Sequence, residues 1–301
     1  MRLLTRSDFD GLACGALLTN LGLIDGFEYV HPKDVQDGKV VATENDILAN
    51  VPYIEGCGMW FDHHSSENER NKGNIKFKGE SRIEKSAARI IYDYFGGDKA
   101  FPNFKDMIYF VDKVDSADLT TGEILNPYGW ILIGFLMDPR TGLGRFRNYR
   151  ISNYQLMAKL MALCGEGIDT ILKDPDVIER VEVYKHQNEL FRDMLDQYTK
   201  IDGNCIITDL RGVETIYSGN RFLIYSLYPG QNISVWVVDG RNKQNVALAV
   251  GHSVIKKDSQ VDVGSLMLKY GGGGHKKVGT CQVPYEEADE AIQEIVKCTN
   301  I

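Results

Sequence analysis

The chain has 301 residues, of which 43% are hydrophobic and 25% charged, and its formal net charge is −8. This length exceeds what one hydrophobic core usually supports, so we expect two domains, and the composition excludes an intrinsically disordered protein. The net negative charge disfavours binding to long duplex DNA, which depends on neutralising many phosphates. A local basic pocket for a small anionic substrate is compatible with it.

Cysteine usage and the lack of long apolar segments favour a cytoplasmic protein. The six cysteines are scattered, and no two have the C-x-x-C spacing of zinc ribbons and redox motifs. The first residues show no signal-peptide core. No segment has the roughly 18 uninterrupted apolar residues that a membrane span needs, so we expect no membrane association.

Short strand-like runs alternate with helical patterns over the first hundred residues. Strands are expected at residues 2–6, 27–32, 39–46 and 58–64, and helices at residues 12–24 and 85–97. This alternation predicts an α/β fold with a doubly wound, mostly parallel sheet that is covered on both faces. Ligands of such sheets bind at the carboxyl ends of the strands.

The second half of the chain is expected to form a helical connector and a smaller α/β domain. Residues 103–200 read as mostly helical and end in a long helix at about 174–200. Further strands are expected at 204–210, 222–229, 232–240, 245–255 and 280–284, and helices at 263–270 and 286–298. We therefore predict domains at residues 1–200 and 201–301.

Aspartates lie at or just after the ends of three of the expected strands. Asp8 and Asp10 lie in the turn after the first strand, one residue apart. Asp46 ends the third strand and Asp62 follows the apolar part of the fourth. Two carboxylates at this spacing can bind one hard cation, although aspartate is also common in ordinary turns and caps.

Two consecutive histidines, His63 and His64, come directly after the apolar run 59–61 and Asp62. Neutral imidazole is a ligand for Mn²⁺, Fe²⁺, Co²⁺ and Zn²⁺, and carboxylate accepts Mg²⁺ and Mn²⁺. A structural histidine usually stands alone. The pair therefore favours a metal site in which one ring binds the ion and the other orients a water or a substrate oxygen.

Three further aspartates, Asp112, Asp115 and Asp118, recur every three residues at the end of an apolar helix. The spacing places them on one side of the helical end. A solvated acidic face is the alternative interpretation. Asp115 is followed by a serine and an alanine, which leaves room for close approach.

Four glycines, Gly271–Gly274, precede His275, Lys276 and Lys277. Backbone N–H groups without side chains can wrap a phosphate or a carboxylate. A flexible turn is the alternative, but glycine is costly to order, so four in a row favour a binding loop.

A basic segment places Arg140, Arg145, Arg147 and Arg150 among Phe146 and Tyr149. Arginines and aromatics together can hold phosphates and stack a base. A solvated basic loop is the interpretation that we favour for this segment.

In order and spacing, these motifs resemble those of the DHH phosphoesterase superfamily with its DHH-associated C-terminal domain. The matching segments are SDFDG at 7–11, Asn45–Asp46, FDHH at 61–64 and GGGGHKKVGT at 271–280. The resemblance covers nearly the whole chain and is greatest to the oligoribonuclease and exopolyphosphatase-related branch. It implies a DHH-type metal-binding domain at 1–200 and a substrate-binding domain at 201–301.

The resemblance also implies a site that holds one or two ions, usually Mn²⁺, with Mg²⁺ or Co²⁺ as alternatives. The implied metal ligands are Asp8, Asp10, Asp46, Asp62, His63 and Asp115, with Asp112 as second choice for the last. The implied catalytic residues are Asp62 and His64, with His64 contacting the scissile phosphate. The implied substrate clamp consists of Gly271, Gly272, Gly273, Gly274 and His275.

One position departs from the family pattern. Many members have a histidine two or four residues before the first aspartate, where this chain has Arg6 and Leu4. Leucine and a permanently charged guanidinium do not ligate metals. Three outcomes stay open: one metal site is weakened, water completes its shell, or Arg6 binds a substrate phosphate directly.

The sequence therefore predicts a metal-dependent phosphoesterase that hydrolyses a small phosphorylated substrate with metal-activated water. The candidate substrates are a short oligonucleotide, a linear or cyclic dinucleotide, an adenosine bisphosphate or a polyphosphate end. Short single-stranded nucleic acid is a compatible partner, and homodimer formation is left open. The alternative is a catalytically weakened sensor of nucleotides or phosphate with the same fold.

Overall fold

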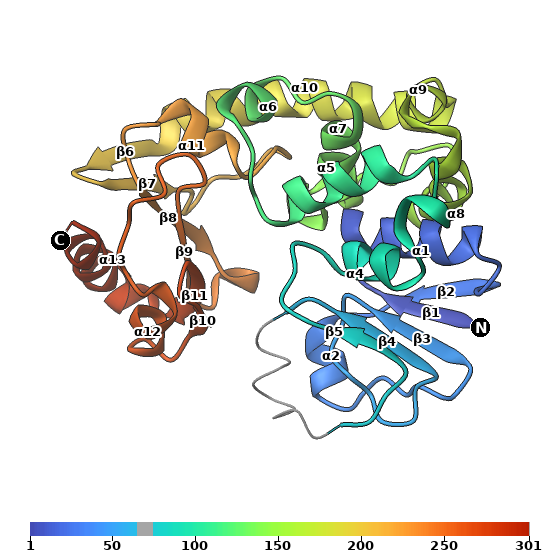
Figure 1. Ribbon diagram of the computed structural model, residues 1–301. Helices are drawn as coiled ribbons and strands as arrows, with labels where there is room; N and C mark the ends of the chain where they lie inside the picture. The colour runs from blue at the N-terminus through green and yellow to red at the C-terminus, as the bar shows by residue number, and fades with distance from the viewer. Residues whose placement is uncertain (65–74, 301) are drawn as a thin grey trace. The chain divides into compact units, whose positions relative to one another are not determined.

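The computed structural model describes residues 1–64 and 75–300, which form two compact units (Figure 1). Unit 1 comprises Met1–Asp118 and Pro127–Tyr184, and unit 2 comprises Leu119–Asn126 and Lys185–Ile301. The long helix α10 (Pro175–Tyr198) begins in unit 1 and ends in unit 2, as expected for a helical connector. The domain boundary expected near residue 200 stays a prediction.

A five-stranded sheet organises unit 1. Its strands are β1 (Arg2–Thr5), β2 (Gly26–Tyr29), β3 (Asp46–Ala49), β4 (Met59–Asp62) and β5 (Gly79–Ser81). They are all parallel and lie in the order β2-β1-β3-β4-β5. The winding direction therefore reverses between β1 and β3, and every strand has its carboxyl end at the same edge of the sheet. The predicted parallel α/β architecture is confirmed.

Alternate residues of the central strands point to opposite faces of this sheet. Phe61 packs against Tyr94 and Phe95 on one face, whereas Trp60 packs with Tyr53 and Phe77 on the other. The first face is covered by α1 (Phe9–Asn20), α4 (Ala87–Tyr94), α5 (Lys105–Asp115) and α8 (Asn153–Leu163). The short helix α2 (Pro32–Gln36) lies on the other side of the sheet in Figure 1.

The remaining helices that the structure describes before residue 200 are short. They are α6 (Thr121–Leu125), α7 (Gly129–Met137) and α9 (Ile168–Leu172). Single 3₁₀ turns occupy Gly97–Lys99, Pro139–Thr141, Leu143–Arg145, Cys164–Glu166 and, in unit 2, Arg241–Lys243. The expectation that residues 103–200 are mostly helical is confirmed.

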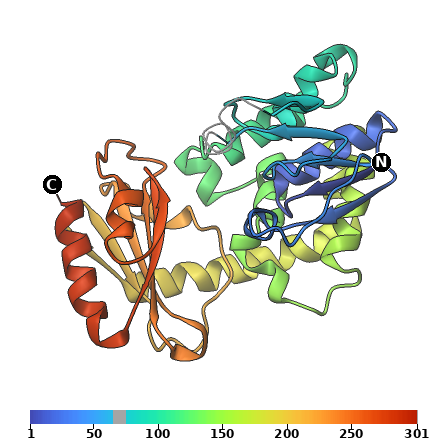
Figure 2. The ribbon, with the colours of Figure 1, turned by 90° about the horizontal axis from the view of Figure 1, so that it is seen from below.

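Unit 2 contains a mixed six-stranded sheet with the order β10-β11-β9-β8-β7-β6. The strands are β6 (Thr199–Asp202), β7 (Cys205–Asp209), β8 (Ile233–Asp239), β9 (Val246–His252), β10 (Gly273–His275) and β11 (Val278–Val283). Only β7 and β8 pair in parallel; the other neighbours are antiparallel. Besides α6 and the end of α10, this unit contains the helices α11 (Leu223–Leu227), α12 (Val263–Leu268) and α13 (Tyr285–Thr299), and Figure 2 shows α13 lying along the sheet.

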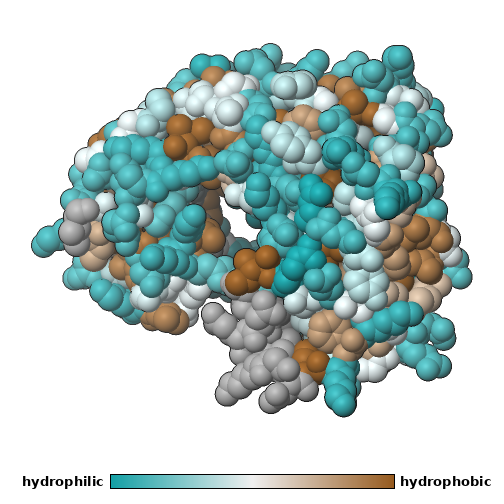
Figure 3. Space-filling view, in the orientation of Figure 1, coloured by the Kyte–Doolittle hydropathy of each residue, from teal (hydrophilic) through white to brown (hydrophobic). Residues whose placement is uncertain are grey.

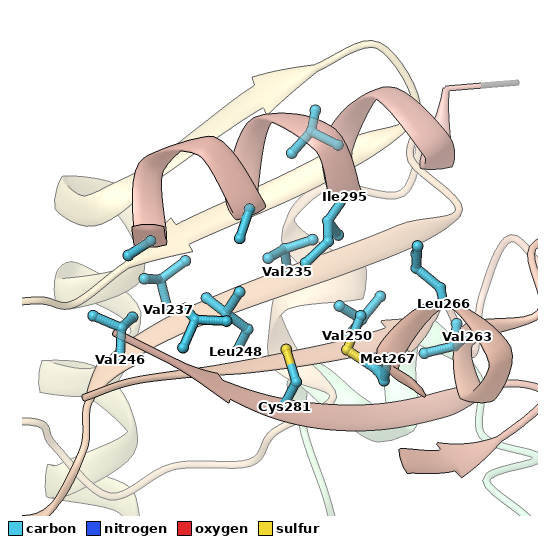
Figure 4. Close-up of a cluster of buried hydrophobic side chains, with 14 of the residues drawn as sticks. Val235, Val237, Val246, Leu248, Val250, Val263, Leu266, Met267, Cys281 and Ile295 are labelled. Atoms are coloured by element: carbon cyan, nitrogen blue, oxygen red, sulfur yellow. The ribbon is translucent and has the colours of Figure 1, made fainter. Parts of the chain in front are cut away.

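The core of unit 2 lies between this sheet and the helices α12 and α13 (Figure 4). Val235 and Val237 of β8 alternate with less buried residues, and Leu248 of β9 lies beside them. Met267 of α12 and Ile295 of α13 close the cluster. Alternate side chains of the strands pack against the apolar faces of the helices and form one continuous apolar layer.

Two predicted strands are wrong. Residues 39–45 are not a strand, because the Asp46 carboxylate accepts hydrogen bonds from Thr43 N (2.7 Å) and Thr43 Oγ1 (2.9 Å) in a turn that precedes β3. Residues 222–229 include the helix α11 instead of a strand, and Asn220 Oδ1 accepts from Phe222 N just before it. Short apolar runs do not distinguish a buried strand from a buried helix.

On the face drawn in Figure 3, hydrophilic residues predominate and hydrophobic ones form small scattered patches. Within residues 1–64 and 75–300, no helix is both long enough and apolar enough to cross a membrane.

The core in Figure 4 generates a stability prediction. Leu248→Ala removes a fully buried side chain and is expected to lower the free energy of unfolding by about 2–5 kcal/mol, because it leaves a cavity between the sheet and α13. Leu268→Ala is the matched control, since that side chain is 66% exposed. Urea denaturation of both variants measures the difference. Equal losses would contradict the assignment of this core.

Candidate functional site

The loops at the carboxyl ends of β1, β3 and β4 bring polar side chains to one edge of the parallel sheet. Asp8 follows β1, Asn50 follows β3, and His63 and His64 follow β4. The edge between β1 and β3 is the switch point at which ligands bind in doubly wound sheets. The last residue of α5, Asp115, joins this group from the helical layer.

Asp10, His63 and Asp115 form a compact cluster of ligand-type atoms. His63 Nε2 lies 3.8 Å from Asp10 Oδ2 and 3.4 Å from Asp115 Oδ2, and all three atoms lie within 4.8 Å of one another. Within the part of the chain that the structure describes, this is the one group of at least three histidine, cysteine or acidic side chains at that spacing. The cluster has the size of a site for one metal ion.

The hydrogen bonding of His63 indicates that the cluster needs a cation. The Nδ1 atom lies 3.2 Å from the Glu84 carbonyl oxygen, which only accepts, so Nδ1 carries a proton. Nε2 is then the free atom; it is buried without a hydrogen-bond partner and faces two carboxylates. In the neutral ring its lone pair would oppose those of the carboxylates. A metal ion, or a proton on Nε2, removes this conflict.

The amino end of α4 fixes Asp10 in place. Its two carboxylate oxygens accept hydrogen bonds from Ala87 N (2.9 Å) and Ala88 N (2.8 Å), and Asp10 also lies in the first turn of α1. Burial, and after it the charge of Asp8, raises the pKa of Asp10 to about 6, although His63 and the two α4 amides act to lower it. The helix amides orient this acid even though its surroundings disfavour the charge.

Burial and the neighbouring charges also shift the pKa values of Asp115 and His63. Desolvation within the cluster and the nearby charge of Asp10 raise the pKa of Asp115 to about 7, although 27% of its side chain is exposed. Burial opposes protonation of His63, but Asp10 and Asp115 outweigh it and raise the pKa of the imidazole. The two carboxylates lie close together and are poorly solvated, so ionising both is unfavourable. A bound divalent ion would offset their repulsion.

Asp62 orients the ring of His64. Asp62 is the last residue of β4 and is fully buried. Its carboxylate contacts His64 Nδ1 at 2.9 Å and accepts from the His64 backbone N at 3.2 Å. The ring of His64 is 36% exposed and lies 4.2 Å from the ring of His63, centre to centre. With Nδ1 bonded to Asp62, the Nε2 atom remains for a substrate or water.

Asp8 is engaged by protein groups on both carboxylate oxygens. Oδ1 accepts from Gly11 N at 2.9 Å and from Asn50 Nδ2 at 3.1 Å, and Oδ2 lies 3.2 Å from Arg6 Nε. Asp8 thereby acts as the N-cap of α1. Asn50 was not predicted from the sequence. It is a polar residue directly after the apolar run Ile47-Leu48-Ala49, but the third strand was expected to end before this run.

Two predicted metal ligands lie elsewhere. Asp46 is the first residue of β3, paired in register with Arg2, so it lies at the amino edge of the sheet, where Arg2 Nε binds it at 2.7 Å. The prediction that Asp46 joins the carboxyl edge is wrong, because the strand starts where it was expected to end. The second choice Asp112 is also wrong: it binds Ser86 Oγ at 2.7 Å and Arg89 Nη2 at 2.7 Å.

The glycine run of unit 2 forms a hairpin, in which β10 pairs with β11. A Cβ at Gly272 would lie 2.1 Å from the Thr280 carbonyl oxygen, and one at Gly274 would lie 2.2 Å from that of Val278. These two glycines are therefore required by strand packing. By contrast, a Cβ at Gly273 would meet nothing within 4 Å.

The backbone amides of this run are partly used by the fold. Gly271 N donates to Leu268 O at 3.1 Å and Gly272 N to Met267 O at 3.0 Å. The expectation that Gly271 and Gly272 wrap an anion with their amides is therefore wrong. The open space at Gly273 and the exposed His275 keep the substrate role of this hairpin as a prediction.

Arg140 lies within electrostatic reach of the acid cluster. Its Nε donates to Asp138 Oδ1 at 2.7 Å. Burial opposes its charge, but Asp138 and the more distant Asp8 and Asp115 raise the pKa of the guanidinium. The side chain is 53% exposed. The interpretation of this segment as a solvated basic loop stays a prediction.

Comparison with known proteins relates this arrangement to phosphodiesterases. The chain is 46% identical to the pGpG-specific phosphodiesterase PggH from Vibrio cholerae, over 99% of this chain and 98% of that chain, with a TM-score of 0.88. An exopolyphosphatase-related protein from Bacteroides fragilis has 13% identity over 98% of this chain and 91% of its own, with a TM-score of 0.52, which is a likeness of fold.

No protein-family model and no curated protein matches the chain. Identity of 46% over nearly the full length of both chains nevertheless relates this chain to PggH in sequence as well as fold. The resemblance seen in the motifs is confirmed: the chain belongs to the DHH phosphoesterase superfamily.

Proposed function

We propose that this chain is a metal-dependent phosphodiesterase that hydrolyses a short linear dinucleotide, with pGpG as the first candidate. The relative that is 46% identical is named for its specificity toward pGpG, which supports this substrate class. The observation that carries the metal dependence is the buried, unpartnered Nε2 of His63 between two carboxylates. We place the activity in the cytoplasm.

Asp10, His63 and Asp115 would hold the ion. One nitrogen and carboxylate oxygens suit Mn²⁺, Co²⁺ or Mg²⁺ better than a soft metal. When bound, such an ion lowers the pKa of a water and screens the charge of the phosphate. The α4 amides that bind Asp10 and the Glu84 carbonyl that accepts from His63 hold two of these side chains in position without the ion.

His64 would contact the scissile phosphate. Asp62 fixes the proton of His64 on Nδ1, so Nε2 accepts a proton or, once protonated, donates a hydrogen bond to a phosphate or leaving-group oxygen. The buried carboxylate of Asp62 stabilises the imidazolium that forms. This pair therefore moves a proton at a defined atom, His64 Nε2.

Arg6 and Arg140 supply positive charge for the substrate's phosphates in a chain whose net charge is −8. Arg6 is anchored on Asp8, and Arg140 on Asp138. Guanidinium groups bind phosphate through paired N–H donors. In unit 2, Gly273 and His275 would bind the end of the substrate that is not cleaved.

His64 generates the first test. His64→Ala is expected to lower kcat for pGpG by about 10²–10⁴-fold in the presence of Mn²⁺, because the positioned proton-transfer group is lost. His186→Ala, at an exposed position of α10, is the matched control and should keep full activity. Unchanged kcat in His64→Ala would contradict the assigned role. Tight binding of pGpG without hydrolysis by the unmodified protein would instead identify a sensor.

Asp115 and Asp112, both in α5, distinguish a metal ligand from a structural acid. At a Mn²⁺ concentration 100 times the Kd, the ion stabilises the protein by about 2.7 kcal/mol. Asp115→Asn is expected to abolish most of the resulting rise in Tm. Asp112→Asn should keep the rise but lower the metal-free stability by about 1–3 kcal/mol, because Arg89 loses its buried partner. Thermal scans with and without Mn²⁺ measure both. An undiminished Mn²⁺ shift in Asp115→Asn would exclude this ligand.

His275 tests the role of the hairpin. His275→Ala is expected to raise KM for pGpG by about tenfold, the effect of losing one hydrogen bond to a charged group. Hydrolysis of a nitrophenyl phosphodiester, which lacks the distal end, should not change. Steady-state kinetics with both substrates provide the comparison. Parallel losses on both would assign His275 to the chemical step.

A further inference from the structure

Asp8 is a buried carboxylate whose charge is already compensated within the protein. Only 6% of the residue is exposed, and its partners are the Arg6 guanidinium, the Asn50 amide and the Gly11 backbone N–H. A buried charge with a cation and two hydrogen-bond donors has no need of a further counter-ion. Asp8 differs in this respect from Asp10 and Asp115, which have no arginine or lysine partner among the described residues.

Asn50 is held rigidly in the arrangement that serves Asp8. Its backbone has a positive φ of 59°, and its N–H donates to the Phe61 carbonyl oxygen at 3.0 Å. The residue is 1% exposed, so the side chain has little freedom to turn. The central strand of the sheet thus presents a neutral amide at the carboxyl edge, whereas β4 ends in the carboxylate of Asp62.

A second divalent ion at Asp8 would have to displace these partners. It would compete with Arg6 for Oδ2 and with the Asn50 amide for Oδ1, and it would lie beside a guanidinium that cannot lose its proton. Among their histidine, cysteine and acidic side chains, the described residues offer one group of three ligand atoms within 4.8 Å of one another, which is the set Asp10, His63 and Asp115. The His63 side chain is 10% exposed, and its buried Nε2 atom, which has no hydrogen-bond partner, faces the two carboxylates of that set.

We propose that the centre holds a single divalent ion, at Asp10, His63 and Asp115, and that the Arg6 guanidinium takes the place of a second ion. The inference rests on the proposed function for the role of the bound ion. In this proposal, Arg6 and Asn50 are the residues that limit the centre to one ion. Arg6 also remains a phosphate ligand, since a guanidinium has donors beyond the Nε that contacts Asp8.

Metal stoichiometry tests the proposal directly. The full-length, metal-stripped protein is titrated with Mn²⁺, and free Mn²⁺ is counted by electron paramagnetic resonance. We expect saturation at one ion per chain, with the low-temperature spectrum of an isolated ion. Two bound ions with an exchange-coupled spectrum would overturn the proposal. Because this measurement uses the unmodified chain, it does not depend on any variant folding.

A double variant tests whether Arg6 and Asn50 limit the centre to one ion. Arg6→Gln combined with Asn50→Asp removes the cation and supplies a carboxylate, so the stoichiometry is expected to rise from one to two. Asn45→Asp, an exposed asparagine beside the amino end of β3, is the matched control and should stay at one. If the double variant does not fold, Asn50→Asp alone is titrated. A folded variant that stays at one ion would overturn the role of Arg6 and Asn50.

Hydrolysis of pGpG by the same samples separates this inference from the proposed function. Two ions together with hydrolysis would overturn the single-ion centre and leave the phosphodiesterase intact. One ion without hydrolysis of any dinucleotide would support the single-ion centre and count against the proposed substrate. No bound Mn²⁺ would overturn both.

Discussion

The hydrogen bonds from the first amides of α4 to the carboxylate of Asp10 hold the candidate site together. Ala87 N and Ala88 N each donate to one oxygen, and Asp10 itself stands in the first turn of α1. One side chain therefore joins two helices that cover the same face of the sheet. His63 and Asp115 then meet this fixed acid, and their altered proton affinities follow from its burial and charge.

Burial also explains why the edge of the sheet divides into two electrostatically different parts. Around Asp8, arginine and amide donors match the negative charge inside the protein. Around Asp10, the acids and the imidazole present more acceptors than donors. A site with an excess of buried acceptors takes up a cation, whereas a site with matched partners does not. The difference arises between the N-cap of α1, Asp8, and a residue of its first turn, Asp10.

The parallel sheet and most of its helices were predictable, because apolar runs with period two or near 3.6 locate them. Asp46 was misplaced because Val40 and Val41 read as strand residues, while the turn between Thr43 and Asp46 that starts β3 depends on side-chain hydrogen bonds. The choice between Asp112 and Asp115 depends on Arg89, 23 residues from Asp112 in the chain. Glycine is required at position 272 because a Cβ there would collide with the carbonyl oxygen of Thr280. Such partners are set by tertiary structure.

The position of Asp115 at the last residue of α5 adds a consequence of its own. The carboxyl end of a helix carries partial negative charge, so an aspartate there is repelled by its own backbone. Asp10, by contrast, faces the positive ends of two helices. A cation at the cluster would therefore neutralise the end of α5 more than any other element. Unit 1 ends at Asp118, three residues after Asp115, so the helix end that a cation would neutralise is also the last helical segment before the chain enters unit 2.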